Sequence, residues 1–102
     1  MQRRPRADLT GAQRKKLRGL AHHLQPLVRV GQQGLGEAVV DAVAEALERH
    51  ELIKVKLLES APADRKEAGP WLAQQCGAHL VGTVGRVLIL YRRHKDRPQV
   101  PL

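Results

Sequence analysis

Two glycines at positions 31 and 34 enclose a two-residue tip, and this loop is the part of the chain whose residue types and spacing best suit chemistry. The pattern predicts that a short apolar strand ends at Gly31 and that a helix begins soon after Gly34. A Gly-x-x-Gly loop exposes backbone N–H groups with no side chain in the way, and the dipole of the following helix reinforces them. We interpret the loop as a phosphate cradle. A tight glycine turn without a ligand is the alternative that the motif alone leaves open.

The chain is strongly basic, with 18 Lys and Arg residues against 10 Asp and Glu residues and a formal net charge of +8. The excess lies at the two ends, in residues 1–18 and 86–102, whereas the residues between them are net acidic. Such an uneven distribution produces a localised positive field, and its natural partner is a polyanion. An ordinary soluble surface is the alternative reading of the same charges.

Length and composition narrow the class of protein. A chain of 102 residues with 42% hydrophobic residues fits one domain with a single modest core. One cysteine excludes a disulfide within the chain, and no apolar run approaches the roughly 18 residues that span a bilayer. The basic N-terminus lacks the apolar stretch of a secretory signal. We therefore expect no contact with a membrane and a cytoplasmic location.

The first half of the chain alternates helix and strand. Thr10 and Gln13 form a capping-box pattern that predicts a helix over 11–23, with a cationic polar side. A short strand is predicted over 27–30, in which Arg29 points away from the face shared by the flanking valines.

The next two elements carry the clearest periodicities. A 3.6-residue period predicts a helix over 36–50, and its row of acidic residues is interpreted as a solvated face. Residues 52–58 alternate as a strand with one wet, positive face. The apolar side of that strand consists of Ile53, Val55 and Leu57, and the wet side of Lys54 and Lys56.

Asp64 can cap a third helix that runs to about residue 76, and Gly77 suits a left-handed stop. Gly69 and Pro70 interrupt this helix, because an interior proline costs on the order of 3 kcal/mol. We expect a kink there, or a restart with Pro70 in the first turn.

Two final strands, over 79–84 and 87–92, are predicted to form a hairpin through Gly85 and Arg86. The last strand is apolar on both faces, which places it inside the sheet. The order α-β-α-β-α-β-β predicts an α/β protein of the α+β two-layer type with a four-stranded mixed sheet. After Arg93 we expect the chain to be polar and frayed.

Four blocks of sequence resemble, in order and spacing, the CRM domain, named for chloroplast RNA splicing and ribosome maturation. The similarity is greatest to the stand-alone bacterial form, the YhbY-like proteins, and covers residues 9–97. Residues 1–8 are interpreted as a disordered basic arm and residues 98–102 as a flexible tail. The four blocks are residues 17–22 (LRGLAH), 30–35 (VGQQGL), 50–56 (HELIKVK) and 85–92 (GRVLILYR).

The resemblance implies an RNA-binding module with a two-layer fold similar to the C-terminal domain of bacterial translation initiation factor three. It implies association with precursors of the large ribosomal subunit, through a loop that corresponds to Gly31 through Gly34, and no catalytic activity. This chain departs from the family pattern at Gly36, where a helix-capping Thr or Ser is usual, and at Gly69 and Pro70.

We predict an RNA-binding surface that attracts phosphates irrespective of sequence. The only Phe, Trp or Tyr residues are Trp71 and Tyr91. Trp71 is expected in the core, whereas Tyr91 is interpreted either as a core ring with its hydroxyl at the sheet edge or as a platform for a base. With so little aromatic surface, recognition should depend more on backbone shape than on base identity. The candidate RNA-binding residues are Arg14, Lys15, Arg18, His22, Arg29, Gly31, Gln32, Gln33, Gly34, Lys54, Lys56, Arg86 and Arg92.

Enzyme and metal sites find little support in the sequence. Cys76 and His79 are three residues apart, but a helix end lies between them, and a small buried thiol is the preferred interpretation. The histidines lack the spacing of a zinc site, and the glycine loop lacks the Lys-Ser/Thr of a nucleotide-binding P-loop. We expect no enzyme activity, cofactor, metal or small-molecule substrate, and a monomer. A protein-interaction adaptor with incidental RNA contact remains the alternative function.

Overall fold

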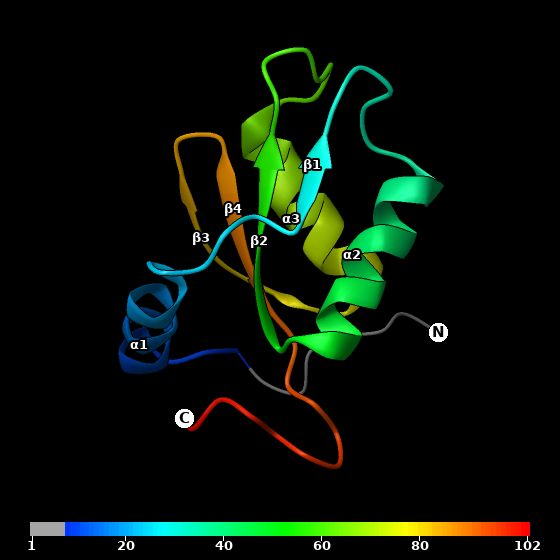
Figure 1. The fold of residues 1–102 in the computed structure, drawn as a ribbon. Helices are drawn as coiled ribbons and strands as arrows, with labels where there is room; N and C mark the ends of the chain where they lie inside the picture. The colour runs from blue at the N-terminus through cyan, green and yellow to red at the C-terminus, as the bar shows by residue number, and fades with distance from the viewer. Residues whose placement is uncertain (1–7) are drawn as a thin grey trace.

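The computed structural model describes residues 8–102, and the predicted order α-β-α-β-α-β-β is confirmed (Figure 1). The predicted basic arm, apart from Asp8, lies outside the described residues. The elements are α1 (Gly11–Ala21), β1 (Val28–Val30), α2 (Glu37–Arg49), β2 (Leu52–Leu57), α3 (Arg65–Cys76), β3 (His79–Val84) and β4 (Val87–Tyr91).

The four strands form one mixed sheet in the order β1-β2-β4-β3. β1 and β2 are parallel, whereas β4 is antiparallel to both of its neighbours, β2 and β3. β4 is thus an interior strand, as its two apolar faces predict. The hairpin between β3 and β4 turns at Gly85, whose positive φ of 59° is the conformation that a two-residue hairpin loop requires.

The two faces of the sheet are covered unequally. α2 and α3 pack on one face, where Ile53, Val55 and Leu57 of β2 join the larger core cluster. The shorter α1 packs on the opposite face, where Leu17 and Ala21 contact a second cluster that is formed by Leu52, Val81, Ile89 and Tyr91. That cluster lies at the end of the sheet where β2 begins and β4 ends. α1 therefore leaves the other end of its face uncovered.

Helix ends follow from local sequence. The capping box of α1 forms as predicted, because Gln13 N–H donates to Thr10 Oγ1 at 3.1 Å and Thr10 N–H donates to Gln13 Oε1 at 3.0 Å. α1 ends at Ala21, two residues before the predicted limit. α2 begins after Gly36, which provides no side-chain cap.

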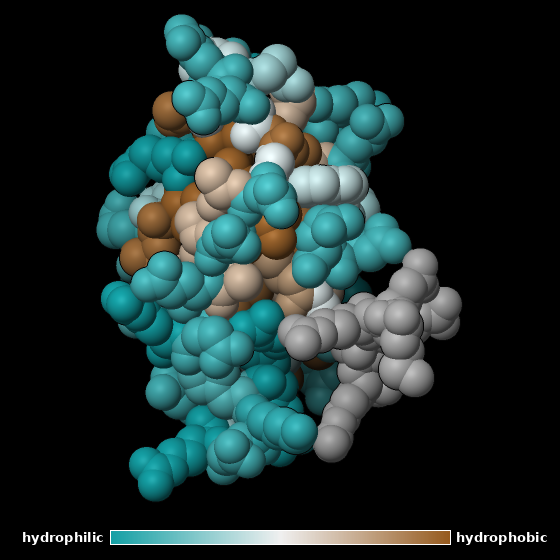
Figure 2. Space-filling model, turned by 90° about the vertical axis from the view of Figure 1, so that its right-hand side faces the viewer, coloured by the Kyte–Doolittle hydropathy of each residue, from teal (hydrophilic) through white to brown (hydrophobic). Residues whose placement is uncertain are grey.

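Seen from the side of α2, apolar side chains reach the surface between hydrophilic ones in the upper part of the molecule (Figure 2).

α3 corrects one expectation. Asp64 caps it as predicted, but the helix runs without a break from Arg65 to Cys76, so a restart with Pro70 in the first turn is wrong. Buried residues on both sides of Pro70, among them Ala68 and Leu72, hold the two halves of the helix on the core. Gly69 allows this close packing, because an added Cβ would lie 2.8 Å from Leu80 Cδ2.

Candidate nucleic-acid interface

The glycine loop is a closed turn with an exposed tip. The Gly34 N–H donates to the Gly31 carbonyl at 2.9 Å, and the side chains of Gln32 and Gln33 are exposed. Gly34 has a φ of +70°, and a Cβ there would lie 3.1 Å from Pro62 Cγ, so the fold requires glycine at this position.

Gly31 differs from Gly34 in what the fold demands. An added Cβ at Gly31 would lie 3.8 Å from Leu58 Cδ1, which is ordinary van der Waals contact, and its φ is not in the left-handed region. Alanine would therefore fit at position 31 without strain. The glycine there leaves space for an external group to approach the backbone.

The loop and the start of α2 supply backbone donors. Among the hydrogen bonds of residues 8–102, none uses the N–H groups of Gln32, Gln33 or Leu35. The first N–H within α2 to find a helical partner belongs to Val40, which donates to the Gly36 carbonyl at 3.0 Å. The exposed carboxylate of Glu37 is the one acidic group in the first turn of α2. The arrangement offers several N–H donors at a positive helix end.

Three connections meet at the loop end of the sheet (Figure 1). The Leu58 N–H donates to the Val30 carbonyl at 2.9 Å, which joins the glycine loop to the connection between β2 and α3. The Leu57 N–H donates to the carbonyl of Arg86 at 2.8 Å, and Arg86 Nη1 donates to the Leu58 carbonyl at 3.4 Å. Arg86 thus lies at the same end of the sheet as the glycine loop.

Cations gather on the uncovered part of the face that α1 shares. Arg29 of β1 is the register partner of Lys56 of β2, and both side chains are exposed. Lys54, two residues earlier on β2, is half-buried, and its Nζ donates to the His22 carbonyl at 3.4 Å. We call this surface the basic face; its residues are Lys15, Arg18, His22, Arg29, Lys54 and Lys56.

α1 contributes to the basic face through one flank. Lys15, Arg18 and His22 are exposed and recur at helical spacing beside the buried Leu17. The stem of Arg18 lies over β3, because its Cδ would be 3.3 Å from a Cβ added at Gly82. Arg29, Lys54 and Lys56 are therefore neighbours on β1 and β2, and Lys54 reaches the His22 backbone at the end of α1. Arg18 lies over β3, the opposite edge strand of the sheet.

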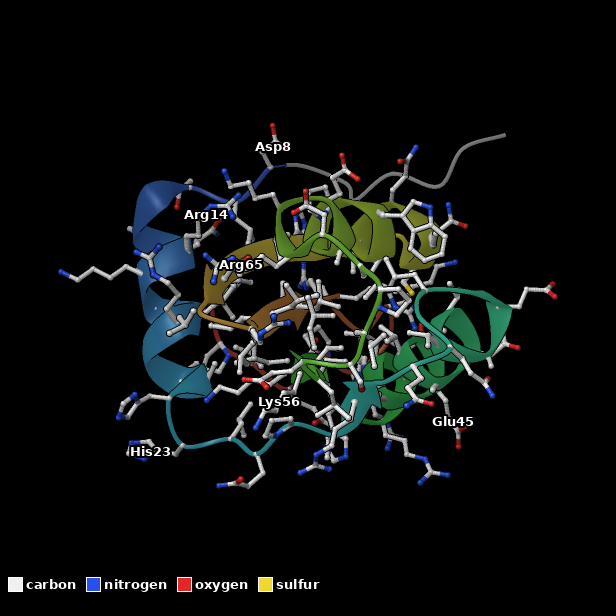
Figure 3. The ribbon with its side chains drawn as sticks, turned by 90° about the horizontal axis from the view of Figure 1, so that it is seen from above. Asp8, Arg14, His23, Glu45, Lys56 and Arg65 are labelled. Atoms are coloured by element: carbon white, nitrogen blue, oxygen red, sulfur yellow. The ribbon has the colours of Figure 1, made fainter. Side chains whose placement is uncertain are left out.

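Charges on the basic face lack acidic partners within the part of the chain that the structure describes. The ion pairs between residues 8 and 102 are Arg49–Glu45 at 3.0 Å and Arg92–Glu48 at 2.8 Å, and both involve α2. In the view from above, Lys56 lies between α1 and β1, whereas Glu45 lies on α2 (Figure 3). Arg29 and Lys56 are thus two like charges on neighbouring strand positions, and they repel each other.

Two predicted residues are engaged in structural contacts instead. Arg14 Nη1 donates to the carbonyls of Leu80 at 2.5 Å and Val81 at 3.3 Å, where β3 has a register shift, and so holds α1 against the sheet. Arg92 donates to the Cys76 carbonyl at 2.9 Å and pairs with Glu48, and its side chain is only 20% exposed. Neither guanidinium joins the basic face.

Sequence reasoning missed Glu51, which is 1% exposed. Its carboxylate accepts hydrogen bonds from the backbone N–H groups of His94 at 2.7 Å, Gln99 and Val100. Burial raises the pKa of Glu51, but these three hydrogen bonds, together with the electrostatic interaction with His94, hold the pKa below its ordinary value. Glu51 lies in the 50–56 block of the family resemblance, but its anchoring role could not be predicted, because its donors are backbone groups more than 40 positions away.

The other reactive side chains are structural. Cys76 is a buried thiol as predicted, and burial raises its pKa, which disfavours the nucleophilic thiolate. Tyr91 is buried and stacks on His79 with ring centroids 6.2 Å apart, so it presents no platform to a base. Within the described part of the chain, no three His, Cys, Asp or Glu residues are placed to hold a metal ion. None of the described helices is long and apolar enough to cross a membrane.

The sequence model of the CRS1/YhbY (CRM) domain matches residues 9–92. The chain belongs to this domain family. It is 38% identical over 94 residues to the Bacillus subtilis protein named "Probable RNA-binding protein YqeI". That alignment covers 92% of this chain and 98% of the relative. It is 39% identical over 88 residues to a Haemophilus influenzae protein named "RNA-binding protein", over 86% and 89% of the two chains.

A solved structure confirms the architecture of this CRM domain. The solution structure of a Staphylococcus aureus protein, described there as a candidate for RNA binding, superimposes with a TM-score of 0.79 at 34% identity. The alignment covers 93% of this chain and 99% of the other. The mixed four-stranded sheet with three helices is therefore a fold that the two proteins share.

Proposed function

We propose that this CRM domain is a non-enzymatic, cytoplasmic RNA-binding protein that binds ribosomal RNA of large-subunit precursors during ribosome assembly. The observation that carries the proposal is the pair of exposed, adjacent cations Arg29 and Lys56, which have no ion-pair partner among residues 8–102. The names of the relatives support RNA as the polyanion. The family resemblance supports the large-subunit precursor as its source.

The geometry supports two sets of phosphate contacts, one made by the glycine loop and one by the basic face. The glycine loop would receive one phosphate on the N–H groups of Gln32, Gln33 and the start of α2. The basic face would contact neighbouring phosphates through Arg29, Lys56 and Arg18. Because Tyr91 is buried, RNA would be recognised mainly by the shape of its backbone.

A double substitution tests the basic face. Arg29→Ala with Lys56→Ala should lower affinity for precursor ribosomal RNA and reduce the slope of log K against log salt by about 1.5 units. Arg49→Ala with Lys66→Ala is the matched control, since it removes one exposed arginine and one exposed lysine elsewhere. Filter binding across a salt series measures both. Equal slopes for the two double variants would place the RNA contact away from the basic face.

The cellular role requires a separate experiment. The protein should sediment with immature large subunits in a salt-sensitive manner and be depleted from mature ribosomes, and its loss should let large-subunit precursors accumulate. Sedimentation only with free protein complexes, with unchanged subunit profiles after deletion, would favour the adaptor function. The exposed acidic residues of α2, among them Asp41 and Glu45, would then be the first surface to examine.

A further inference from the structure

The segment after β4 is held in place although its sequence is polar. Two N–H groups near its end, those of Gln99 and Val100, and the N–H of His94 donate to the carboxylate of Glu51. The His94 ring also lies 2.9 Å, through Nε2, from the Leu47 carbonyl. Val100 packs against the apolar cluster under α1. These contacts differ from the fraying that the sequence predicts after Arg93.

Glu51 is the anchor of this segment. A buried carboxylate is costly unless hydrogen bonds compensate it, and those to Glu51 come from the C-terminal segment. Both carboxylate oxygens are used, Oε2 by His94 and Oε1 by Gln99 and Val100. The carboxylate thus fixes the path of residues 94–100 across the end of the sheet.

Because its path is fixed, the segment directs some of its side chains toward the protein and others toward solvent. Arg92 and His94 are turned toward the protein, where both make hydrogen bonds, whereas Arg93, Lys95 and Arg97 are exposed. These three cations border a surface hollow of about 750 Å³, together with Gly77, Glu48 and Asp96. A concave surface with excess positive charge concentrates the field on an approaching anion.

The segment lies at the end of the sheet opposite to the glycine loop (Figure 1). The register agrees, because Leu52, the first residue of β2, pairs with Tyr91, the last residue of β4. The molecule measures 35 Å along its longest axis, so one structured RNA can extend over both ends.

We propose that the segment anchored by Glu51 is a second RNA-binding surface, on which Arg93, Lys95 and Arg97 contact phosphates of the RNA that the basic face binds. This inference rests on the proposed function. It adds residues that lie beyond the end of the family match at position 92. It also assigns Glu51 the part of a positioning residue, which acts on RNA only by holding the cations in place.

Removal of the cations is the first test. Arg93→Ala with Lys95→Ala should lower RNA affinity roughly tenfold at low salt and reduce the salt slope. The matched control is again Arg49→Ala with Lys66→Ala, which changes the net charge equally. Equal affinities of these two double variants would overturn the proposal.

Release of the segment is the sharper test, because charge and position then predict opposite results. Glu51→Gln removes a negative charge, so net charge alone predicts unchanged or tighter RNA binding. The amide keeps one acceptor but places an NH₂ group against backbone donors, so we expect the segment to loosen and affinity to fall about threefold. Tighter or unchanged binding by a folded Glu51→Gln protein would overturn the positioning part of the proposal.

A charge-neutral variant guards against misfolding of Glu51→Gln. Gln99→Pro removes one N–H donor to Glu51 in the exposed tail and alters no charge, and we expect the same direction of effect. The double variant Arg29→Ala with Lys56→Ala separates the two proposals. If it loses RNA binding while Arg93→Ala with Lys95→Ala and Gln99→Pro bind RNA as the wild type does, this inference is wrong and the proposed function stands. If the wild-type protein itself binds no RNA, the proposed function fails.

Discussion

The basic face and the exposed side of α2 are both highly charged, but they differ in how many of their charged side chains form ion pairs. On α2, Glu45 pairs with Arg49 and Glu48 with Arg92, so acidic residues find cationic partners within the fold. On the basic face, Arg29 lies beside Lys56 without an acidic partner among the described residues. The difference indicates that α2 pairs two of its four carboxylates within the fold. The basic face pairs none of its cations with a described acidic residue and is complementary to an anion outside the protein.

The two glycines of the loop show the same contrast on a smaller scale. Gly34 is required by its positive φ and by its contact with Pro62. Gly31 meets neither demand, since ordinary space surrounds its missing side chain. Gly34 is thus explained by folding, and Gly31 is better explained by the approach of a ligand.

The largest expected effect comes from adding negative charge to the loop tip. Gln32→Glu with Gln33→Glu should weaken RNA binding on the order of a hundredfold at low salt, because two carboxylates would face the bound phosphate. Urea unfolding should be unchanged, since both side chains are exposed. The isosteric control is Gln74→Glu with Gln75→Glu on α3, which adds the same charges at two other exposed glutamines. Equal losses in the two variants would mean that net charge, and not the loop, governs binding.

Arg92 should contribute to the stability of the fold and not to RNA binding. Arg92→Ala removes a half-buried guanidinium that links β4 with α2 and α3, and we expect a loss of about 2 kcal/mol in the free energy of unfolding. Urea denaturation measures this, and RNA affinity per folded molecule should stay within about twofold of the control Arg49→Ala. A strong loss of affinity in the folded variant would return Arg92 to the RNA-binding surface.

Alanine substitutions separate the two glycines. Gly34→Ala should lower the free energy of unfolding by about 1 to 2 kcal/mol, because alanine is strained at a φ of +70° and meets Pro62. Gly31→Ala should leave the urea midpoint unchanged and weaken RNA binding several-fold, since its methyl group obstructs the backbone. Were Gly31→Ala to bind RNA normally, the loop would be a structural turn only.

Much of the fold could be predicted from local sequence. Thr10 and Gln13 mark the start of α1, and the alternation in β2 identifies its buried side, because both signals depend on nearby residues alone. The expected restart at Pro70 is wrong because the cost of an interior proline is local, whereas burial of Leu72 and Ala68 in the core is tertiary. Contacts between distant segments decided the rest.

The same limit separates the candidate site residues. Lys56 and Arg29 could be assigned to exposed strand faces from the period of two, and the structure places them side by side. Arg14 and Arg92 carry the same charge in the sequence, yet their guanidinium groups donate hydrogen bonds to backbone carbonyls of other elements. Sequence position gives the charge of an arginine but not the partner that the folded chain offers it.

The smallest expected effect is a dependence of stability on pH that originates in Glu51. Its pKa in the folded protein lies below the ordinary value of 4.5, so the folded state holds this proton less readily than the unfolded state. The stability that the carboxylate contributes is therefore fully present above pH 4.5 and is lost as the pH falls through the pKa of the folded protein. Urea midpoints of wild type and Glu51→Gln, compared at pH 7 and at pH 3, should differ more at pH 7. A difference that is the same at both pH values would show that the Glu51 carboxylate does not anchor the C-terminal segment through its charge.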